Sequence, residues 1–252
     1  MKQYAYPTAD VEARALAIRS EIGDDPLYLT LLSNLTTLAH RCRFALGPGG
    51  SLAARYLDLP FAAVSFYGEG ADLRTTLSKV LGAGELCYAL LGEEQQAQLS
   101  SVTHVVRLYP EWQMVYLGDP AALEPGDAVP LVAADFPAMQ ALAARGGVMA
   151  FEANALEKGP YNGVWRDERL ASMAGTHLTL ERMAEIGNVA TDPDYRRQGL
   201  ATMTVSATTV ALRAEGMLVV LQVLKSNIAA VAFYEKVGFV RSRSMCLIQF
   251  EL

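Results

Sequence analysis

The stretch VATDPDYRRQGLAT (189–202) leaves an apolar strand, turns at an Asp-Pro pair, and places two arginines and a glycine before a helix-like segment. The first turn of a helix leaves backbone N–H groups unpaired, and the helix dipole adds roughly half a positive charge there. Gly199 has no Cβ, so the backbone can approach an anion, and the small Ala201 keeps the helix start open. Arg196 and Arg197 can add charge-assisted hydrogen bonds. The stretch predicts an anion site; the alternative is a solvated arginine pair on a surface loop.

A second polar cluster follows the buried strand predicted for MLVVLQVL (217–224). Asn227 comes shortly after that strand, and Tyr234 lies about two helical turns further on, so both side chains can face one cleft. If the strand lies parallel to residues 186–191, a ligand can run between the two strands with its phosphates at residues 196–201. The alternatives are that Asn227 caps the helix and that Tyr234 belongs to the core.

The composition is typical of a globular protein with a sizeable core, because 52% of the 252 residues are hydrophobic and 19% are charged. The net charge of −6 argues against a nucleic-acid or membrane partner, so an anionic ligand must be held by local groups. Three widely spaced cysteines without a CxxC pair favour reduced thiols, and no His/Cys pattern predicts a metal. MKQYAYPTAD (1–10) lacks the apolar run of a signal peptide, so we expect a cytoplasmic protein.

A cluster of Pro and Gly in DPAALEPGDAVP (119–130) divides the chain, and we predict two α/β domains, residues 1–126 and 127–252. In the first domain, periodicity predicts helices over 11–22 and 26–42, and a hairpin or two strands over 104–119. The segments predicted for the second domain are two antiparallel strands over 161–183, a third strand over 184–192, a helix over 200–216, a strand over 217–224, a helix over 227–238 and a terminal strand over 239–252.

Two motifs of the second domain resemble the signatures of the GNAT acyltransferase superfamily. GNVATDPDYRRQGLA (187–201) is similar to the first signature, Arg/Gln-x-x-Gly-x-Gly/Ala, at Arg196, Gly199 and Ala201. KSNIAAVAFYEKVGFV (225–240) resembles the second signature at Asn227, Ala230, Tyr234, Gly238 and Phe239. YNGVWRDERLASMAG (161–175) is similar to the substrate-side hairpin of the glycine N-acyltransferase-like branch. The resemblance covers roughly residues 128–252 and implies a GNAT fold with a mixed, splayed sheet there, and residues 1–126 can be a degenerate copy of it.

The resemblance implies an acyl-CoA-dependent N-acyltransferase that moves an acetyl group from acetyl-CoA to a primary amine. It implies that the pyrophosphate lies on the backbone N–H groups of residues 197–201 and that the pantetheine lies against Val189 and Thr191, where the parallel strands separate. A backbone N–H near Val189 would polarise the thioester carbonyl. The residues expected to bind the coenzyme are Val189, Ala190, Thr191, Arg196, Arg197, Gln198, Gly199, Leu200, Ala201, Thr202 and Asn227.

Two side chains are candidates for moving protons. Glu185 can act as the base, because an ammonium must lose a proton before it attacks a thioester. It lies 14 residues before Gly199, the same separation as the base glutamate in the histone-acetylating members of the superfamily. Strict alternation along the strand puts Glu185, Gly187 and Val189 on one face. Tyr234 matches the family's tyrosine that protonates the departing thiolate. The alternatives are that Glu185 is a solvated carboxylate and that other residues or a water chain supply the base.

A non-catalytic acyl-CoA-binding or regulatory module is the alternative function, although such a module has no use for a base and an acid at Glu185 and Tyr234. His177 either lines the acceptor pocket or is an exposed strand residue. The sequence leaves open the amine acceptor, the acyl chain length, the role of residues 1–126 and the oligomeric state, with a homodimer as one alternative.

Overall fold

The chain folds into two compact units in this computed structural model, which describes residues 7–149 and 151–252. The first unit contains the residues up to Trp112 together with Ser244–Leu252, and the second contains Gln113–Arg243. The division into functional domains at residue 126 stays a prediction.

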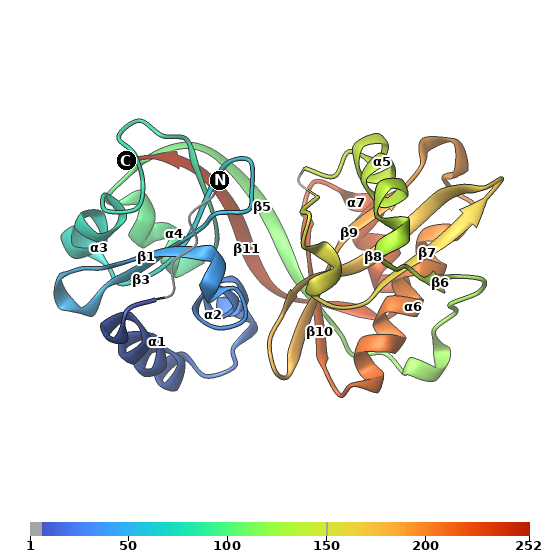
Figure 1. Cartoon of the computed structure of the whole chain (residues 1–252), viewed down its shortest axis with the longest axis horizontal. Coiled ribbons are helices and arrows are strands. Elements are labelled where there is room, and N and C mark those ends of the chain that lie inside the picture. Colours follow the sequence, from blue (N-terminus) through green and yellow to red (C-terminus); the bar gives the residue numbers. More distant parts are fainter. Residues whose placement is uncertain (1–6, 150) are drawn as a thin grey trace. The chain divides into compact units, whose positions relative to one another are not determined.

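Two long strands carry the chain from one unit to the other. The chain leaves the first unit within β5 (His104–Tyr116) and returns to it within β11 (Phe239–Glu251) (Figure 1). The last residues of the sequence therefore belong to the same unit as the first described ones.

The first unit is a mixed sheet with helices packed on both of its faces. Its strands are adjacent in the order β1-β2-β3-β4-β11, in which β3 and β4 are parallel and the β1–β2, β2–β3 and β4–β11 pairs are antiparallel. Besides the parts of β5 and β11, its helices and strands are α1 (Ala9–Ile22), α2 (Leu29–Leu35), β1 (Cys42–Leu46), β2 (Leu52–Tyr56), β3 (Ala62–Tyr67), α3 (Gly70–Leu77), β4 (Cys87–Gly92) and α4 (Glu93–Ser100).

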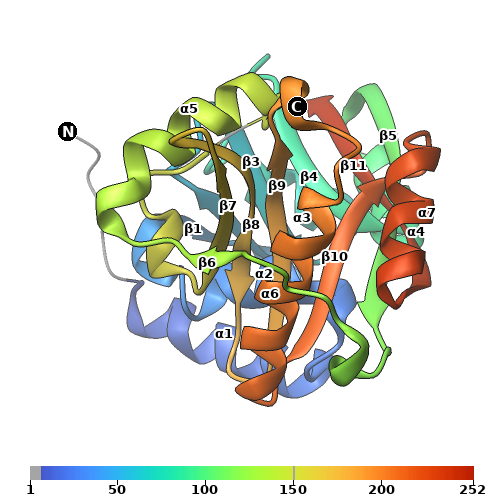
Figure 2. The same ribbon diagram turned by 90° about the vertical axis from the view of Figure 1, so that its right-hand side faces the viewer.

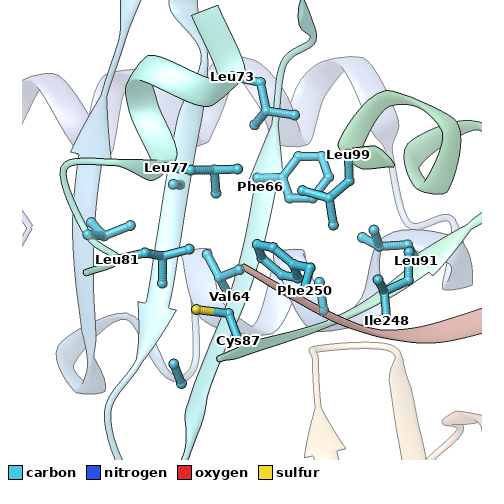
Figure 3. Packing of buried hydrophobic residues seen from close by; sticks show 14 of the residues in the cluster. Val64, Phe66, Leu73, Leu77, Leu81, Cys87, Leu91, Leu99, Ile248 and Phe250 are labelled. Carbon is cyan, nitrogen blue, oxygen red and sulfur yellow. The ribbon is translucent and has the colours of Figure 1, made fainter. Parts of the chain in front are cut away.

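Side-chain alternation along β2 explains the two packed faces of this sheet. Ala53 belongs to an apolar cluster with α3 and α4, whereas Leu52 and Ala54 belong to a cluster with α1 and α2. Figure 3 shows the cluster under α3 and α4, in which Leu99 and Phe250 are fully buried. Phe250 lies on β11, so the end of the chain completes the core of the first unit.

The second unit contains residues 189–202, the stretch predicted to form an anion site. The strands of its sheet are adjacent in the order β10-β9-β8-β7-β6. Strands β9 and β10 are parallel, and the other neighbouring pairs are antiparallel. Its elements, viewed in Figure 2, are β6 (Val129–Pro130), α5 (Phe136–Gly146), β7 (Tyr161–Arg166), β8 (Arg169–Thr179), β9 (Met183–Thr191), α6 (Leu200–Ala214), β10 (Leu218–Leu224) and α7 (Ile228–Val237), with parts of β5 and β11.

Helices α5 and α6 cover opposite faces of β8. Met173 is buried in an apolar cluster with Met139 and Leu142 of α5. Its neighbour Ser172 points the other way, and its Oγ lies 3.3 Å from Oγ1 of Thr204 on α6. Because successive strand side chains point to opposite faces, the sheet separates the two helices. Among the described residues, no helix is both long enough and apolar enough to cross a membrane.

The mixed α/β fold predicted from the sequence is confirmed, and two predictions for single elements are wrong. The helix predicted over 26–42 is shorter: α2 ends at Leu35, where Thr36 leaves helical dihedral angles, and a strand begins at Cys42. The hairpin or strand pair predicted over 104–119 is the single strand β5. No local turn interrupts β5, because it runs on from one unit into the other.

Candidate functional site

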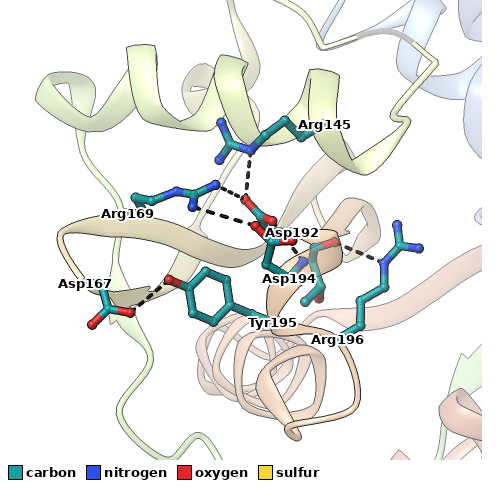
Figure 4. A network of polar contacts seen from close by, with 8 residues as sticks. Arg145, Asp167, Arg169, Asp192, Asp194, Tyr195 and Arg196 are labelled. Carbon is teal, nitrogen blue, oxygen red and sulfur yellow. Dashed lines mark hydrogen bonds and ion pairs between the residues drawn. The ribbon is translucent and has the colours of Figure 1, made fainter.

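Asp192 fixes the start of the loop that carries the two arginines. Its side chain is 2% exposed, and its Oδ2 accepts hydrogen bonds from Arg145 (2.8 Å) and Arg169 (2.9 Å) (Figure 4). Burial by itself would raise the pKa of the carboxyl, but the backbone N–H of Asp194 and the two guanidinium groups outweigh it and hold the pKa below its usual value. The carboxylate therefore ties the end of β9 to α5 and β8.

The turn before α6 is shaped by two residues with left-handed backbone angles. Arg197 has φ 60°, and Gly199, the residue that precedes the helix, has φ 80°. A Cβ added to Gly199 would meet no protein atom within 4 Å, so the space in front of it is open. The first-turn N–H groups of residues 200–202 have no carbonyl partner inside the helix. Both arginine side chains are exposed, and Arg196 Nε donates to the carbonyl of Thr191 at 3.4 Å.

A pocket of about 450 Å³ lies at this helix start, inside the second unit. It lies between the end of β9, the first turn of α6 and the first turns of α7. The lining residues are Gly146, Val189, Ala190, Thr191, Tyr195, Arg196, Arg197, Gly199, Leu200, Ala201, Thr202, Ala229, Ala230 and Phe233. All the residues predicted to bind the coenzyme are in this set except Gln198 and Asn227.

Asn227 has a structural role at the start of α7. Its Oδ1 accepts a hydrogen bond from the N–H of Ala230 at 3.1 Å, which is the helix cap that the sequence left as an alternative. Gln198 is exposed and does not line the pocket. Sequence reasoning missed Phe233 as a lining residue, and the only signal for it was its place one residue before Tyr234. A role for Asn227 and Gln198 in coenzyme binding stays a prediction.

The two parallel strands separate beside the pocket. Residue pairing between β9 and β10 runs from Met183 with Leu218 to Ile186 with Leu221, although both strands continue beyond these residues. On the other side of β9, the register with β8 skips Asn188, which has φ 52°. An extra residue of this kind is a β-bulge, and it leaves backbone groups out of the ladder. Asn188 and Val189 therefore fall outside the regular pairing of β8 with β9, and Val189 lines the pocket.

The bulge changes which side chains of β9 share a face. Gly187 lies against His177 of β8, and Glu185 bonds to the same histidine, so these three residues lie on one face. Val189 and Thr191 fall on the other face, where Thr191 Oγ1 lies 3.0 Å from Ser172 Oγ beneath α6. The strict alternation assumed from the sequence is therefore wrong between Gly187 and Val189.

Glu185 is a buried carboxylate with one hydrogen-bond partner. Its Oε1 lies 2.8 Å from Nδ1 of His177, and its side chain is 6% exposed, whereas the histidine side chain is 38% exposed. Its Oε2 is buried without a hydrogen-bond partner among the described residues. The sequence predicted Glu185 as a candidate base but did not pair it with His177, because that contact depends on the register between β8 and β9.

Tyr234 is buried in an aromatic cluster beside the pocket. Its ring centroid lies 4.9 Å from that of Phe233, which lines the pocket, and 5.9 Å from that of Phe239. Burial raises the pKa of Tyr234 to about 12. Tyr234 itself does not line the pocket. Its contact with the departing thiolate therefore stays a prediction.

The three cysteines all belong to the first unit. All three are buried, and burial, helped by the nearby Asp58, raises the pKa of Cys42 to about 12. Burial also raises the pKa of Cys87 to about 11, so both thiols stay protonated near neutral pH. Across residues 7–149 and 151–252, no group of three or more His, Cys, Asp or Glu side chains is placed to hold a metal ion.

The fold and the pocket together define a class of domain: parallel strands that separate at a bulge, beside a glycine-led helix start flanked by two arginines. The sequence profile described as the acetyltransferase (GNAT) family matches residues 134–239, which span this whole site. Residues 134–239 therefore form a GNAT acetyltransferase domain, and acetyl-CoA is the cosubstrate of that family. The arginines, the free helix N–H groups and the open space at Gly199 fit the phosphates of this cosubstrate.

Two curated relatives are similar to part of the chain. The chain is 39% identical over 74 residues to the [ribosomal protein bS18]-alanine N-acetyltransferase of Salmonella typhimurium strain LT2, which is 29% of this chain and 49% of the relative. The enzyme of that name from Escherichia coli strain K12 is also 39% identical, over 72 residues that cover 28% and 48% of the two chains. The chain thus spans about half the length of the curated relatives it matches.

Solved structures resemble the chain over most of its length. A GNAT-family protein from Novosphingobium aromaticivorans is 27% identical, with a TM-score of 0.66 over 79% of this chain and 87% of that one. A tandem GNAT protein from the clavulanic acid biosynthesis pathway is 15% identical, with a TM-score of 0.65 over 98% and 97% of the two chains. The likeness to a tandem protein extends the GNAT fold to the first unit, which the sequence analysis had left open.

Proposed function

We propose that this protein transfers an acetyl group from acetyl-CoA to a primary amine by direct attack within a ternary complex. The observation that carries the proposal is the pocket at the start of α6, because nine of the eleven residues predicted for the coenzyme line one cavity. The family match over residues 134–239 supports the same cosubstrate.

The coenzyme would lie across the pocket from α6 to the bulge in β9. The pyrophosphate would accept hydrogen bonds from the first-turn N–H groups of α6 and from Arg196 and Arg197. The pantetheine arm would run along Val189 and Thr191 toward Glu185. Val189 lies four positions after Glu185, a span of about 13 Å at the usual rise of a strand.

The carbonyl of the thioester would sit at the bulge. A backbone N–H released from the ladder near Val189 can donate to the oxygen that becomes negative as the amine attacks. No cysteine nucleophile is needed for such a direct transfer. The bulge therefore has a chemical use that a regular strand could not supply.

Tyr234 would stabilise the departing thiolate by a hydrogen bond. The sequence predicted it as the acid, but burial raises its pKa to about 12. Full proton transfer to a thiolate whose thiol has an ordinary pKa near 8.5 would be uphill by about 5 kcal/mol. The proton that ends on sulfur would then come from the attacking nitrogen, with the phenol donating a hydrogen bond.

The acceptor we favour is a small primary amine. The support is the resemblance of residues 161–175 to the substrate-side hairpin of the glycine N-acyltransferase-like branch. The relatives named bS18-alanine N-acetyltransferases favour a second acceptor, an alanine amine of a protein. A non-catalytic coenzyme-binding module is the remaining alternative.

Two measurements test the proposal. Calorimetric titration with acetyl-CoA, desulfo-CoA and 3′,5′-ADP should show micromolar-range binding, with the nucleotide fragment accounting for part of it. Release of free thiol from acetyl-CoA should then be followed with amino acids, polyamines and peptides that begin with alanine. Binding together with amine-dependent thiol release supports the enzyme. Binding without release from any amine supports the module, and absence of binding by the folded protein contradicts both.

A further inference from the structure

We propose that His177 and Glu185 together form the base of this site. His177 accepts the proton, and Glu185 orients the imidazole through the hydrogen bond at Nδ1 and stabilises the positive charge of the protonated ring. The proposal rests on the proposed acetyl transfer and names a residue for one of its steps. It starts from the 2.8 Å contact between Nδ1 of His177 and Oε1 of Glu185.

Exposure decides which of the two groups meets the amine. The Glu185 side chain is 6% exposed and its Oε2 is buried, so an ammonium group cannot reach this carboxylate without displacing protein atoms. The His177 side chain is 38% exposed. Because Nδ1 faces Glu185, the other ring nitrogen, Nε2, is the one left to accept a proton from the substrate. His177 therefore acts as the catalytic residue and Glu185 as a positioning residue.

The backbone is built to bring this histidine to β9. The register between β8 and β9 shifts at Thr176/Leu178, which makes His177 the extra residue of a bulge. Bulges re-aim a side chain and occur frequently next to active sites. Opposite His177 stands Gly187, where an added Cβ would come within 2.6 Å of the histidine Cβ. The glycine lets the imidazole lie against β9, next to the bulged residue Asn188 where the thioester carbonyl is proposed.

A purely structural ion pair explains this arrangement less well. A buried carboxylate is costly unless its oxygens are satisfied by hydrogen bonds, and apolar side chains often serve stability equally well. Oε2 of Glu185 has no hydrogen-bond partner among the described residues. The residues before and after Glu185 on β9, Ala184 and Ile186, are apolar and buried. A negative charge in that place does, however, stabilise an imidazolium that forms when His177 accepts a proton.

The protons balance as follows. The acceptor ammonium gives one proton to Nε2 of His177 and becomes an amine. The nitrogen lone pair forms the N–C bond to the thioester carbonyl, and the C–S bond then breaks with its electron pair leaving on sulfur. The second proton passes from the attacking nitrogen to the thiolate, which leaves as free coenzyme A, and His177 returns its proton to solvent.

The test compares His177→Ala with His104→Ala, a histidine of the first unit, in steady-state acetylation of the best amine found. His177→Ala should lower kcat by about 100-fold or more, the usual range for loss of a general base, while the Kd for acetyl-CoA stays within about twofold. Imidazole added to the buffer should restore part of the rate. Glu185→Gln removes the charge, and its amide can donate to Nδ1 and keep the ring proton on Nε2, so kcat should again fall by about 100-fold or more.

A readout without turnover accompanies the kinetics. The chain has three histidines, so ¹⁵N–¹H correlation of the imidazoles, assigned with His177→Ala, can identify the ring nitrogen that carries the proton. The neutral ring of His177 should be protonated at Nδ1, and Glu185→Ala should release that preference.

The outcomes separate this proposal from the proposed function. An unchanged kcat in His177→Ala, a loss that imidazole does not restore, or a proton on Nε2 overturns the two-residue base while leaving the acetyltransferase intact. A wild-type protein that binds acetyl-CoA but acetylates no amine overturns the proposed function, and the base with it.

Discussion

Replacing Gly199 by alanine should weaken coenzyme binding in addition to destabilising the fold. The backbone at this position has φ 80°, which costs an L-residue about 1–2 kcal/mol, so the free energy of unfolding should fall by that amount. The added methyl meets no protein atom within 4 Å, and its position lines the pocket. It would hold a phosphate away from the N–H groups of α6. Losing charge-assisted hydrogen bonds worth about 1.5–3 kcal/mol raises the Kd about 10- to 150-fold.

Gly216 supplies a matched control at the other end of the same helix. It has φ 76°, and an added Cβ there also meets no atom within 4 Å. Gly216→Ala should therefore lower the free energy of unfolding by a similar amount, measured by urea denaturation, and leave the Kd for acetyl-CoA unchanged in calorimetry. If the two variants lose affinity equally, or if Gly199→Ala binds like the wild type, the phosphate position assigned to this turn is wrong.

Three further substitutions test other parts of the site. Arg196→Gln should weaken both acetyl-CoA and 3′,5′-ADP about tenfold and reduce the salt dependence of binding; loss of acetyl-CoA affinity alone would contradict a phosphate contact. Tyr234→Phe keeps the ring packing, so kcat should fall about tenfold with an unchanged Kd, and an unaltered rate would remove the phenol from the mechanism. Asp192→Asn should lower the free energy of unfolding by about 2 kcal/mol at pH 7, less than the roughly 3–5 kcal/mol of a fully buried ion pair because Arg145 and Arg169 are partly exposed. Since the pKa of Asp192 is depressed in the folded protein, this stabilisation is complete above the unfolded-state pKa near 3.9 and is lost as the pH falls through the folded-state value. Denaturation from pH 7 to pH 2 should therefore show the two proteins converge, and a constant difference would exclude the charge as the cause.

Local signals predicted the elements around the pocket well. Gly199 and the apolar period after it indicated α6, and the apolar run before Lys225 indicated β10, which covers Leu218–Leu224. Both depend on residues close together in the sequence. The two antiparallel strands predicted over 161–183 are present as β7 and β8, and the turn between them contains Asp167 and Glu168, both of which have positive φ.

Contacts set by strand register could not be predicted in the same way. The positive φ of Asn188 and the shift at His177 are single-residue interruptions, and the alternation of side chains gives no sign of them. They decide that Glu185 meets His177 and that Val189 turns to the opposite face. The continuous strand β5 was missed for a related reason, because its length follows from its passage between two units rather than from its own residues.

The path of the chain through β5 and β11 sets an order on how the protein can be made. Residues 244–252 supply Ile248 and Phe250 to the core of the first unit, where both are fully buried. A ribosome synthesises these residues only after the whole of the second unit. The first unit is therefore the earlier to be translated and the later to be completed, with β4 lacking its β11 partner during the interval. If residues 1–126 and 127–252 were made as separate chains, β11 could not join the first unit during synthesis. The first fragment would lack a strand of its core, and the second would carry an unpaired apolar tail.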